Sequence, residues 1–122
     1  MKALLVIGAL NGALAVMLGA FGAHGLKSRV DAAMLDVWST ASEYHFYHAL
    51  ALILVGILAK QFGGAGFVSA GWVMLAGMAL FSGSLYALVL SDTRWLGAIT
   101  PLGGTALIIS WAMLAWALYK NT

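Results

Sequence analysis

The chain has 122 residues, 63% of them hydrophobic and 8% charged, with no cysteine and a formal net charge of +2. A water-soluble domain has about a quarter charged residues, so this chain cannot cover itself with a hydrated surface and is expected to be an integral membrane protein. Its length allows one domain, the missing cysteines exclude disulfides and thiolate metal sites, and without a basic run nucleic acid is not an expected partner.

Four stretches of the chain contain no charged residue, and short polar segments separate them. They are Ala3–Leu26, Tyr44–Ala59, Gln61–Ser91 and Trp95–Tyr119. A helix needs about 20 residues to cross the ~30 Å hydrocarbon layer, so these lengths predict four transmembrane helices. We expect the crossings at residues 3–23, 41–60, 67–90 and 97–119. The first follows Lys2 as a secretory signal would, but its apolar run is long for a signal peptide, which favours a retained helix.

A short amphipathic helix is predicted over residues 30–42, after the first crossing. Apolar residues recur there at spacings of three and four, and Asp31, Asp36 and Ser39 fall between them. This pattern is typical of a helix that lies in the membrane interface, and it continues into the second crossing.

Turn signals separate the remaining crossings and define the expected fold class. Residues 63–66 (Gly-Gly-Ala-Gly) form a flexible turn and residues 91–94 a polar loop. Pro101 falls in the first turn of the fourth helix, where its missing N–H costs least. Short loops between consecutive crossings predict one all-α domain, residues 1–122, folded as an antiparallel bundle of four transmembrane helices.

The basic residues divide equally between the two sides of the predicted bundle. The two groups are Lys2, Lys60 and Lys120 beside the termini and Lys27, Arg29 and Arg94 on the other side. The positive-inside count is therefore even. Because all four acids lie on the far side, we expect the termini in the cytoplasm and the chain in the cell membrane.

One face of the first crossing carries small residues and is predicted to pack against a neighbouring helix. At 100° per residue, this face contains Gly8, Asn11, Gly12 and Gly19. Gly8 and Gly12 have the GxxxG spacing of closely packed membrane helices. The amide of Asn11 lies on this face near the middle of the membrane, where it must find a hydrogen-bond partner.

Polar side chains gather in the half of the bundle away from the termini. His45 and His48 share the small-residue face of the second crossing, so both imidazoles are expected to point inward. Ionisable groups at that depth usually pair or serve a pathway. The predicted cluster, a candidate ligand site, comprises His24, His45, His48, Ser82, Tyr86 and Thr100.

Several kinds of site remain open for this cluster. His45 and His48 are the residues that could bind a metal ion, but no carboxylate lies on the inward face, and we predict no metal and no cofactor. Haem would need histidines on two facing helices. Neutral histidine could relay protons, although the membrane-embedded carboxylate of small exporters is missing. A hydrogen-bonded structural cluster, or a pocket for a lipid headgroup or small ligand, would use the same residues.

Five separated motifs along the whole chain resemble those of one small membrane family. In order, they are Gly19-Ala-Phe-Gly-Ala-His-Gly25, Trp38-Ser-Thr-Ala41, Tyr44-His45 with His48-Ala-Leu-Ala-Leu-Ile53, Phe81-Ser-Gly-Ser-Leu-Tyr86 and Ile99-Thr-Pro-Leu-Gly-Gly104. They resemble the family called domain of unknown function 423, whose eukaryotic relatives are the transmembrane protein 256 group. The resemblance implies a four-helix integral membrane protein and supplies no catalytic residues to carry over.

The sequence favours a non-enzymatic membrane component that self-associates and interacts with lipid or with protein partners in the membrane. The sequence shows no hydrolytic arrangement. Ser82 lies in a run of small residues within an apolar helix, which is typical of helix packing. The alternative is a small solute or ion carrier, or a ligand- or metal-binding membrane protein, that uses a polar pocket around His45 and His48.

Overall fold

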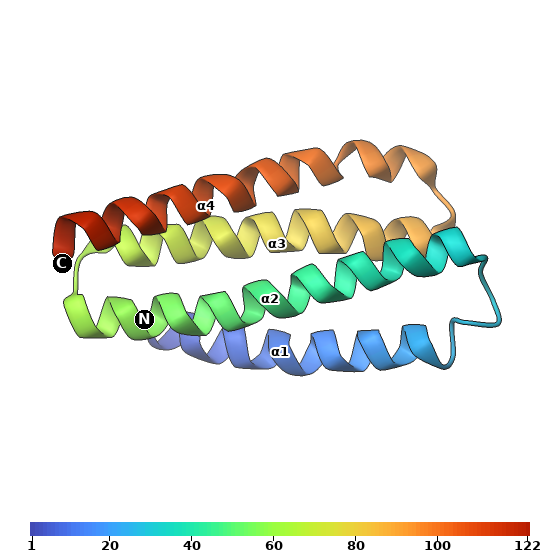
Figure 1. The fold of residues 1–122 in the computed structure, drawn as a ribbon, viewed down its shortest axis with the longest axis horizontal. Helices are drawn as coiled ribbons and strands as arrows, with labels where there is room; N and C mark the ends of the chain where they lie inside the picture. The colour runs from blue at the N-terminus through green and yellow to red at the C-terminus, as the bar shows by residue number, and fades with distance from the viewer.

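The computed structural model describes all 122 residues as four long helices and one short 3-10 helix, without strands. The elements are α1 (Lys2–Ala23), α2 (Ala32–Phe62), α3 (Ala65–Ser91), η1 (Arg94–Ala98) and α4 (Thr100–Asn121). Consecutive helices run antiparallel, and both termini lie toward the end where α2 turns into α3 (Figure 1). All four helices are long and apolar enough to cross a membrane. The predicted all-α antiparallel fold is confirmed.

The amphipathic segment predicted at residues 30–42 forms the first part of α2 from Ala32 onward, with Val30 and Asp31 before the helix. Asp31 is the N-cap of this helix, and its carboxylate accepts a hydrogen bond from the Met34 backbone N–H at 2.9 Å. No break separates this segment from the second crossing, and α2 has 31 residues. At 1.5 Å per residue its length is about 46 Å, more than the ~30 Å hydrocarbon layer, so one part of α2 must tilt or extend beyond that layer.

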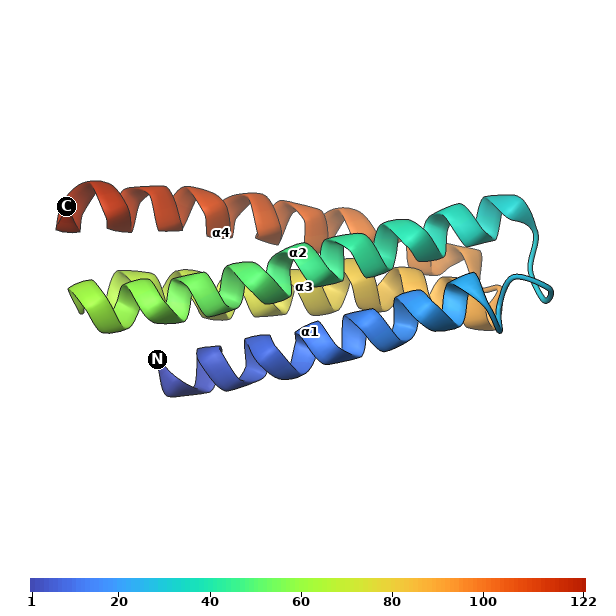
Figure 2. The ribbon, with the colours of Figure 1, turned by 60° about the horizontal axis from the view of Figure 1, so that its bottom comes forward.

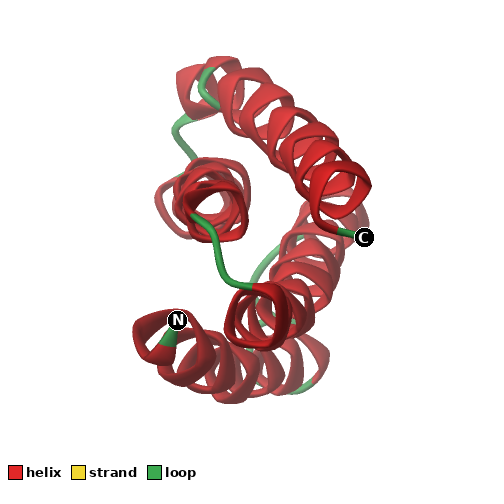
Figure 3. Ribbon diagram, turned by 90° about the vertical axis from the view of Figure 1, so that its left-hand side faces the viewer, coloured by secondary structure: helices red, strands yellow, loops and turns green.

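The four helices pack in chain order. Packing is extensive between α1 and α2, α2 and α3, and α3 and α4, whereas α1 makes only sparse contact with α3. The first and last helices lie on opposite sides of the molecule, with α2 and α3 between them (Figures 2 and 3). The arrangement therefore leaves a gap in direct helix packing between α1 and α3.

Two glycines allow a close backbone approach between α3 and α4. A Cβ atom on Gly77 would lie 2.9 Å from the Leu107 backbone nitrogen, and one on Gly103 would lie 2.8 Å from the Leu80 carbonyl carbon. Only glycine fits at such a contact, as in other close membrane helix pairs. The helical periodicity did not single out these two glycines, although Gly103 lies in one of the motifs that carry the family resemblance.

The glycines of the small-residue face predicted for α1 have different surroundings in the structure. A Cβ on Gly8 would lie 3.0 Å from the Ala49 carbonyl oxygen, and Gly19 faces the Ser42 side chain at 3.8 Å. A Cβ on Gly12 would have nothing within 4 Å, so this glycine makes no close approach to another helix of the same chain. The buried positions Gly8 and Ala15 recur at a seven-residue interval; at 100° per residue, Gly12 falls at the edge of that stripe.

A tryptophan fixes α2 against α1 at the end away from the termini. Trp38 is buried, and its indole N–H donates a hydrogen bond to the Leu18 carbonyl oxygen at 2.7 Å. Gly22 is required beside it, because a Cβ there would overlap the indole ring. With Leu26 and Leu88, Trp38 belongs to a small apolar cluster separate from the main core.

The glycine contacts predict opposite effects for two equivalent substitutions. Gly103→Ala should lower the free energy of unfolding by about 1–3 kcal/mol, because the methyl group must push α3 and α4 apart. Gly12→Ala should leave it unchanged or raise it by up to ~1 kcal/mol, because space is available and alanine favours the helix. Unfolding in detergent micelles, followed by circular dichroism, measures both. Equal losses in the two variants would contradict this packing.

Candidate functional site

A cleft lies between α1 and α3, where these helices make little direct contact. Its volume is about 260 Å³, and α2 contributes His45 to its lining. The remaining lining residues are Asn11, Leu14 and Leu18 from α1 and Leu75, Met78, Ala79, Ser82, Gly83 and Tyr86 from α3. No charged side chain is among them, so the cleft combines an apolar wall with a few neutral hydrogen-bonding groups.

The imidazole of His45 connects the two helices that border the cleft. Its Nε2 atom lies 2.9 Å from Asn11 Oδ1 on α1, and its Nδ1 atom lies 3.0 Å from the Tyr86 hydroxyl on α3. The residue is 5% exposed. Three helices are thus joined by two hydrogen bonds to one side chain.

The direction of these hydrogen bonds follows from the amide of Asn11. Its Nδ2 donates to the Ile7 carbonyl oxygen at 2.9 Å, which leaves Oδ1 facing His45 as an acceptor. His45 must therefore donate through Nε2–H, and in a neutral imidazole its Nδ1 then accepts from the Tyr86 hydroxyl. The result is a one-way chain from Tyr86 through His45 and Asn11 to the backbone of α1, with His45 neutral and protonated on Nε2.

His48 has the opposite tautomer and faces a different helix. Its Nδ1 lies 2.7 Å from the Tyr44 carbonyl oxygen, which can only accept, and its Nε2 lies 3.1 Å from the Trp111 indole nitrogen, which can only donate. His48 is consequently neutral and protonated on Nδ1. This contact joins α2 to α4. The sequence did not predict Trp111 as the partner, because the periodicity of one helix does not say how that helix is rotated against a helix that is not its neighbour in the chain.

The structure brings together three members of the predicted polar cluster and separates the others. His45, Ser82 and Tyr86 line the cleft, and Ser82 donates to the Ala41 carbonyl oxygen at 2.8 Å. Asn11, predicted for helix packing, joins them. The other three members of the predicted cluster do not line this cleft: His48 faces α4, and the remaining two residues lie elsewhere.

The other two residues, His24 and Thr100, lie outside the α1–α3 cleft. His24 is exposed at the C-terminal cap of α1. Thr100 pairs with Ser84 at 2.7 Å in the α3–α4 contact. A metal shared by His45 and His48 does not fit, because their nitrogens turn to different helices and no group of three or more ligating residues is present.

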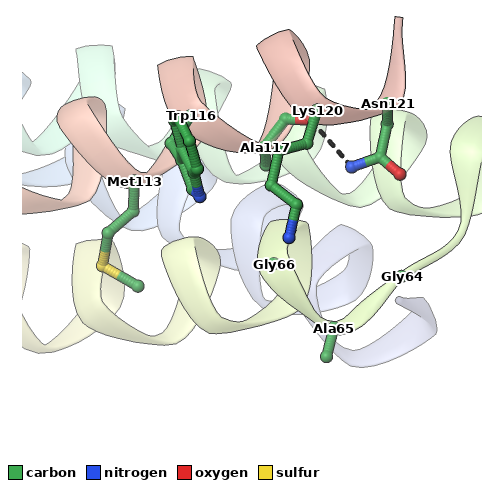
Figure 4. A pocket seen from close by; sticks show the side chains of 8 residues that line it. All are labelled: Gly64, Ala65, Gly66, Met113, Trp116, Ala117, Lys120 and Asn121. Carbon is green, nitrogen blue, oxygen red and sulfur yellow. Dashed lines mark hydrogen bonds between the residues drawn. The ribbon is translucent and has the colours of Figure 1, made fainter.

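A further hollow of about 240 Å³ lies at the end of the molecule that carries the termini, between the start of α3 and the end of α4. Figure 4 shows the Lys120 side chain extending over Gly66, with Trp116 and Asn121 beside it. The Asn121 amide donates to the Ala117 carbonyl oxygen of its own helix at 2.7 Å. This hollow has one charged group and lacks the converging polar groups of the α1–α3 cleft.

Comparison with known proteins relates the whole chain to bacterial membrane proteins. Residues 18–104 match the family described as "Protein of unknown function (DUF423)". The chain is 54% identical over 121 residues to the UPF0382 membrane protein YwdK of Bacillus subtilis (strain 168), and the match covers 98% of both chains. It is 46% identical over 123 residues to the UPF0382 membrane protein SAB0533 of Staphylococcus aureus (strain bovine RF122 / ET3-1), again over 98% of both. No solved structure matches it.

The hydrogen-bond directions predict different tautomers for two histidines three residues apart. Nitrogen-15 NMR of the side chains should show His45 protonated on Nε2 and His48 protonated on Nδ1. Trp111→Phe removes the donor to His48 and should shift the His48 signals while those of His45 stay in place. If both rings carried the proton on the same nitrogen, these hydrogen-bond directions would be wrong.

Proposed function

This chain belongs to the DUF423 family of membrane proteins, and we propose that it is a non-enzymatic binding protein of the cell membrane. Its site is the α1–α3 cleft, and the molecule that it binds is uncharged and soluble in the membrane. The observation that carries this proposal is the cleft itself, in which Tyr86, His45 and Asn11 lie opposite an apolar wall.

The chemistry of the lining favours a neutral ligand with a hydrogen-bonding group. The Tyr86 hydroxyl donates a hydrogen bond to His45 and keeps lone pairs that can accept one, and the Asn11 amide keeps a second N–H. A charged headgroup would lose its hydration here without gaining a counter-ion, because no charged residue lines the cleft. A hydroxyl or carbonyl group on an apolar chain could form hydrogen bonds with these groups and carries no charge that would need a counter-ion.

The size of the cleft favours partial enclosure of such a molecule. Pockets that enclose a whole small ligand usually have volumes of about 300–1,000 Å³. At about 260 Å³, the cleft would hold the polar end and the first part of a chain. The rest of the molecule would extend into the surrounding lipid through the gap between α1 and α3.

The contacts also support a role without catalysis. Both nitrogens of His45 are engaged by Asn11 and Tyr86, and no carboxylate lines the cleft. The Ser82 hydroxyl donates to the backbone rather than to an imidazole. A nucleophile with an adjacent base, which covalent catalysis needs, is therefore not formed at this site.

The proposal includes the orientation and association expected from the sequence. The basic residues divide equally between the two ends, so the proposed cytoplasmic location of the termini rests on the four acidic residues, all of which lie toward the opposite end. The outward faces carry many exposed apolar side chains, Leu10 and Ile108 among them. These faces suit lipid, a second copy or another membrane protein.

A pair of glycine substitutions tests the cleft. Gly83 lines it, and a Cβ added there would have nothing within 4 Å, so Gly83→Leu should fill the cleft without disturbing the fold. Gly12→Leu is the matched control, because Gly12 is equally open but lies outside the cleft. A photoactivatable long-chain alcohol should label cleft peptides about tenfold less in Gly83→Leu, as expected for a loss of ~1.4 kcal/mol in binding. Equal labelling of wild type and Gly83→Leu, with both folded, would overturn the proposal.

A further inference from the structure

A second groove runs along the other side of the contact between α1 and α2. At the end away from the termini it forms a hollow of about 320 Å³. Its polar lining comprises Lys27, Asp36, Ser39 and Ser42. None of these residues lines the α1–α3 cleft, so the groove is a separate feature of the surface.

Two opposite charges border this hollow without pairing with each other. The one ion pair of the chain joins Arg94 to Asp92 at 4.0 Å, which leaves Lys27 and Asp36 free to contact another molecule. Both side chains are exposed. A ligand that carries both an anion and a cation would complement this pair of charges.

The groove becomes apolar on the side nearer the middle of the helices. A hollow of about 220 Å³ adjoins the first one, and the two share Ser42. Its lining includes Ala15, Val16, Phe46 and Tyr47, with one acid, Glu43. From the polar end toward the helix centres, the groove thus changes from charged groups to apolar side chains, as a phospholipid changes from headgroup to acyl chain.

We propose that this groove binds one zwitterionic phospholipid with a phosphoethanolamine headgroup. Lys27 pairs with the phosphate, Asp36 accepts hydrogen bonds from the ammonium group, and one acyl chain lies along Val16 and Phe46. Lipids with a net negative charge fit less well, because Asp36 and Glu43 outnumber the single lysine in the groove. The inference is independent of the ligand proposed for the α1–α3 cleft.

Native mass spectrometry of the purified protein tests this assignment directly. The protein in mild detergent is mixed with equimolar phosphatidylethanolamine and phosphatidylglycerol that have the same acyl chains. Wild type should retain phosphatidylethanolamine preferentially. Lys27→Gln and Asp36→Asn should each lower that retention about two- to fivefold, the range expected for an exposed ion pair.

Matched variants on the same side of the membrane separate site binding from net charge. Arg94→Gln and Asp92→Asn change the charge identically but lie outside the groove, and retention should stay at the wild-type level. Gly83→Leu, which fills the cleft, should also leave it unchanged. Equal retention of the two lipids by wild type, or equal losses in the groove variants and their charge-matched controls, would overturn the proposal.

Discussion

The imidazole of His45 joins three helices, and the shape of the molecule depends on that connection. It bonds to Asn11 of α1 and to Tyr86 of α3, between two helices that otherwise make little contact. In lipid, an unpaired polar group has no water to replace its partner, so such bonds persist. Because a polar connection takes the place of side-chain packing there, α1 and α3 remain apart and the cleft between them stays open.

His48, the second histidine of α2, is an example of a buried polar group whose hydrogen bonds are all satisfied within the protein. His48 accepts a hydrogen bond from Trp111 and donates one to its own helix, and no buried side-chain nitrogen or oxygen lacks a partner. One helix thereby contacts all three others through two residues in different tautomers. The fixed tautomers make the arrangement directional, since exchanging donor and acceptor at either ring would place like groups against each other.

The helices could be predicted from the sequence, but the side-chain contacts between them could not. Length and absence of charge gave four helices, and the family resemblance is confirmed. The 100° rule placed His45 and His48 inward, as found, but it could not say that the rings diverge. Gly103, Trp111 and the openness around Gly12 depend on how helices rotate and cross, which is decided by packing between segments distant in the chain.

A double-mutant cycle between Asn11→Leu and Tyr86→Phe is the most direct measurement of the connection through His45. These two residues are not bonded to each other, so their effects on the free energy of unfolding should add unless His45 links them. Loss of the Tyr86 donor frees His45 to change tautomer, which weakens its bond to Asn11. We therefore expect a coupling of about 0.5 kcal/mol or more in detergent micelles. Strict additivity of the two substitutions would contradict a connection through His45.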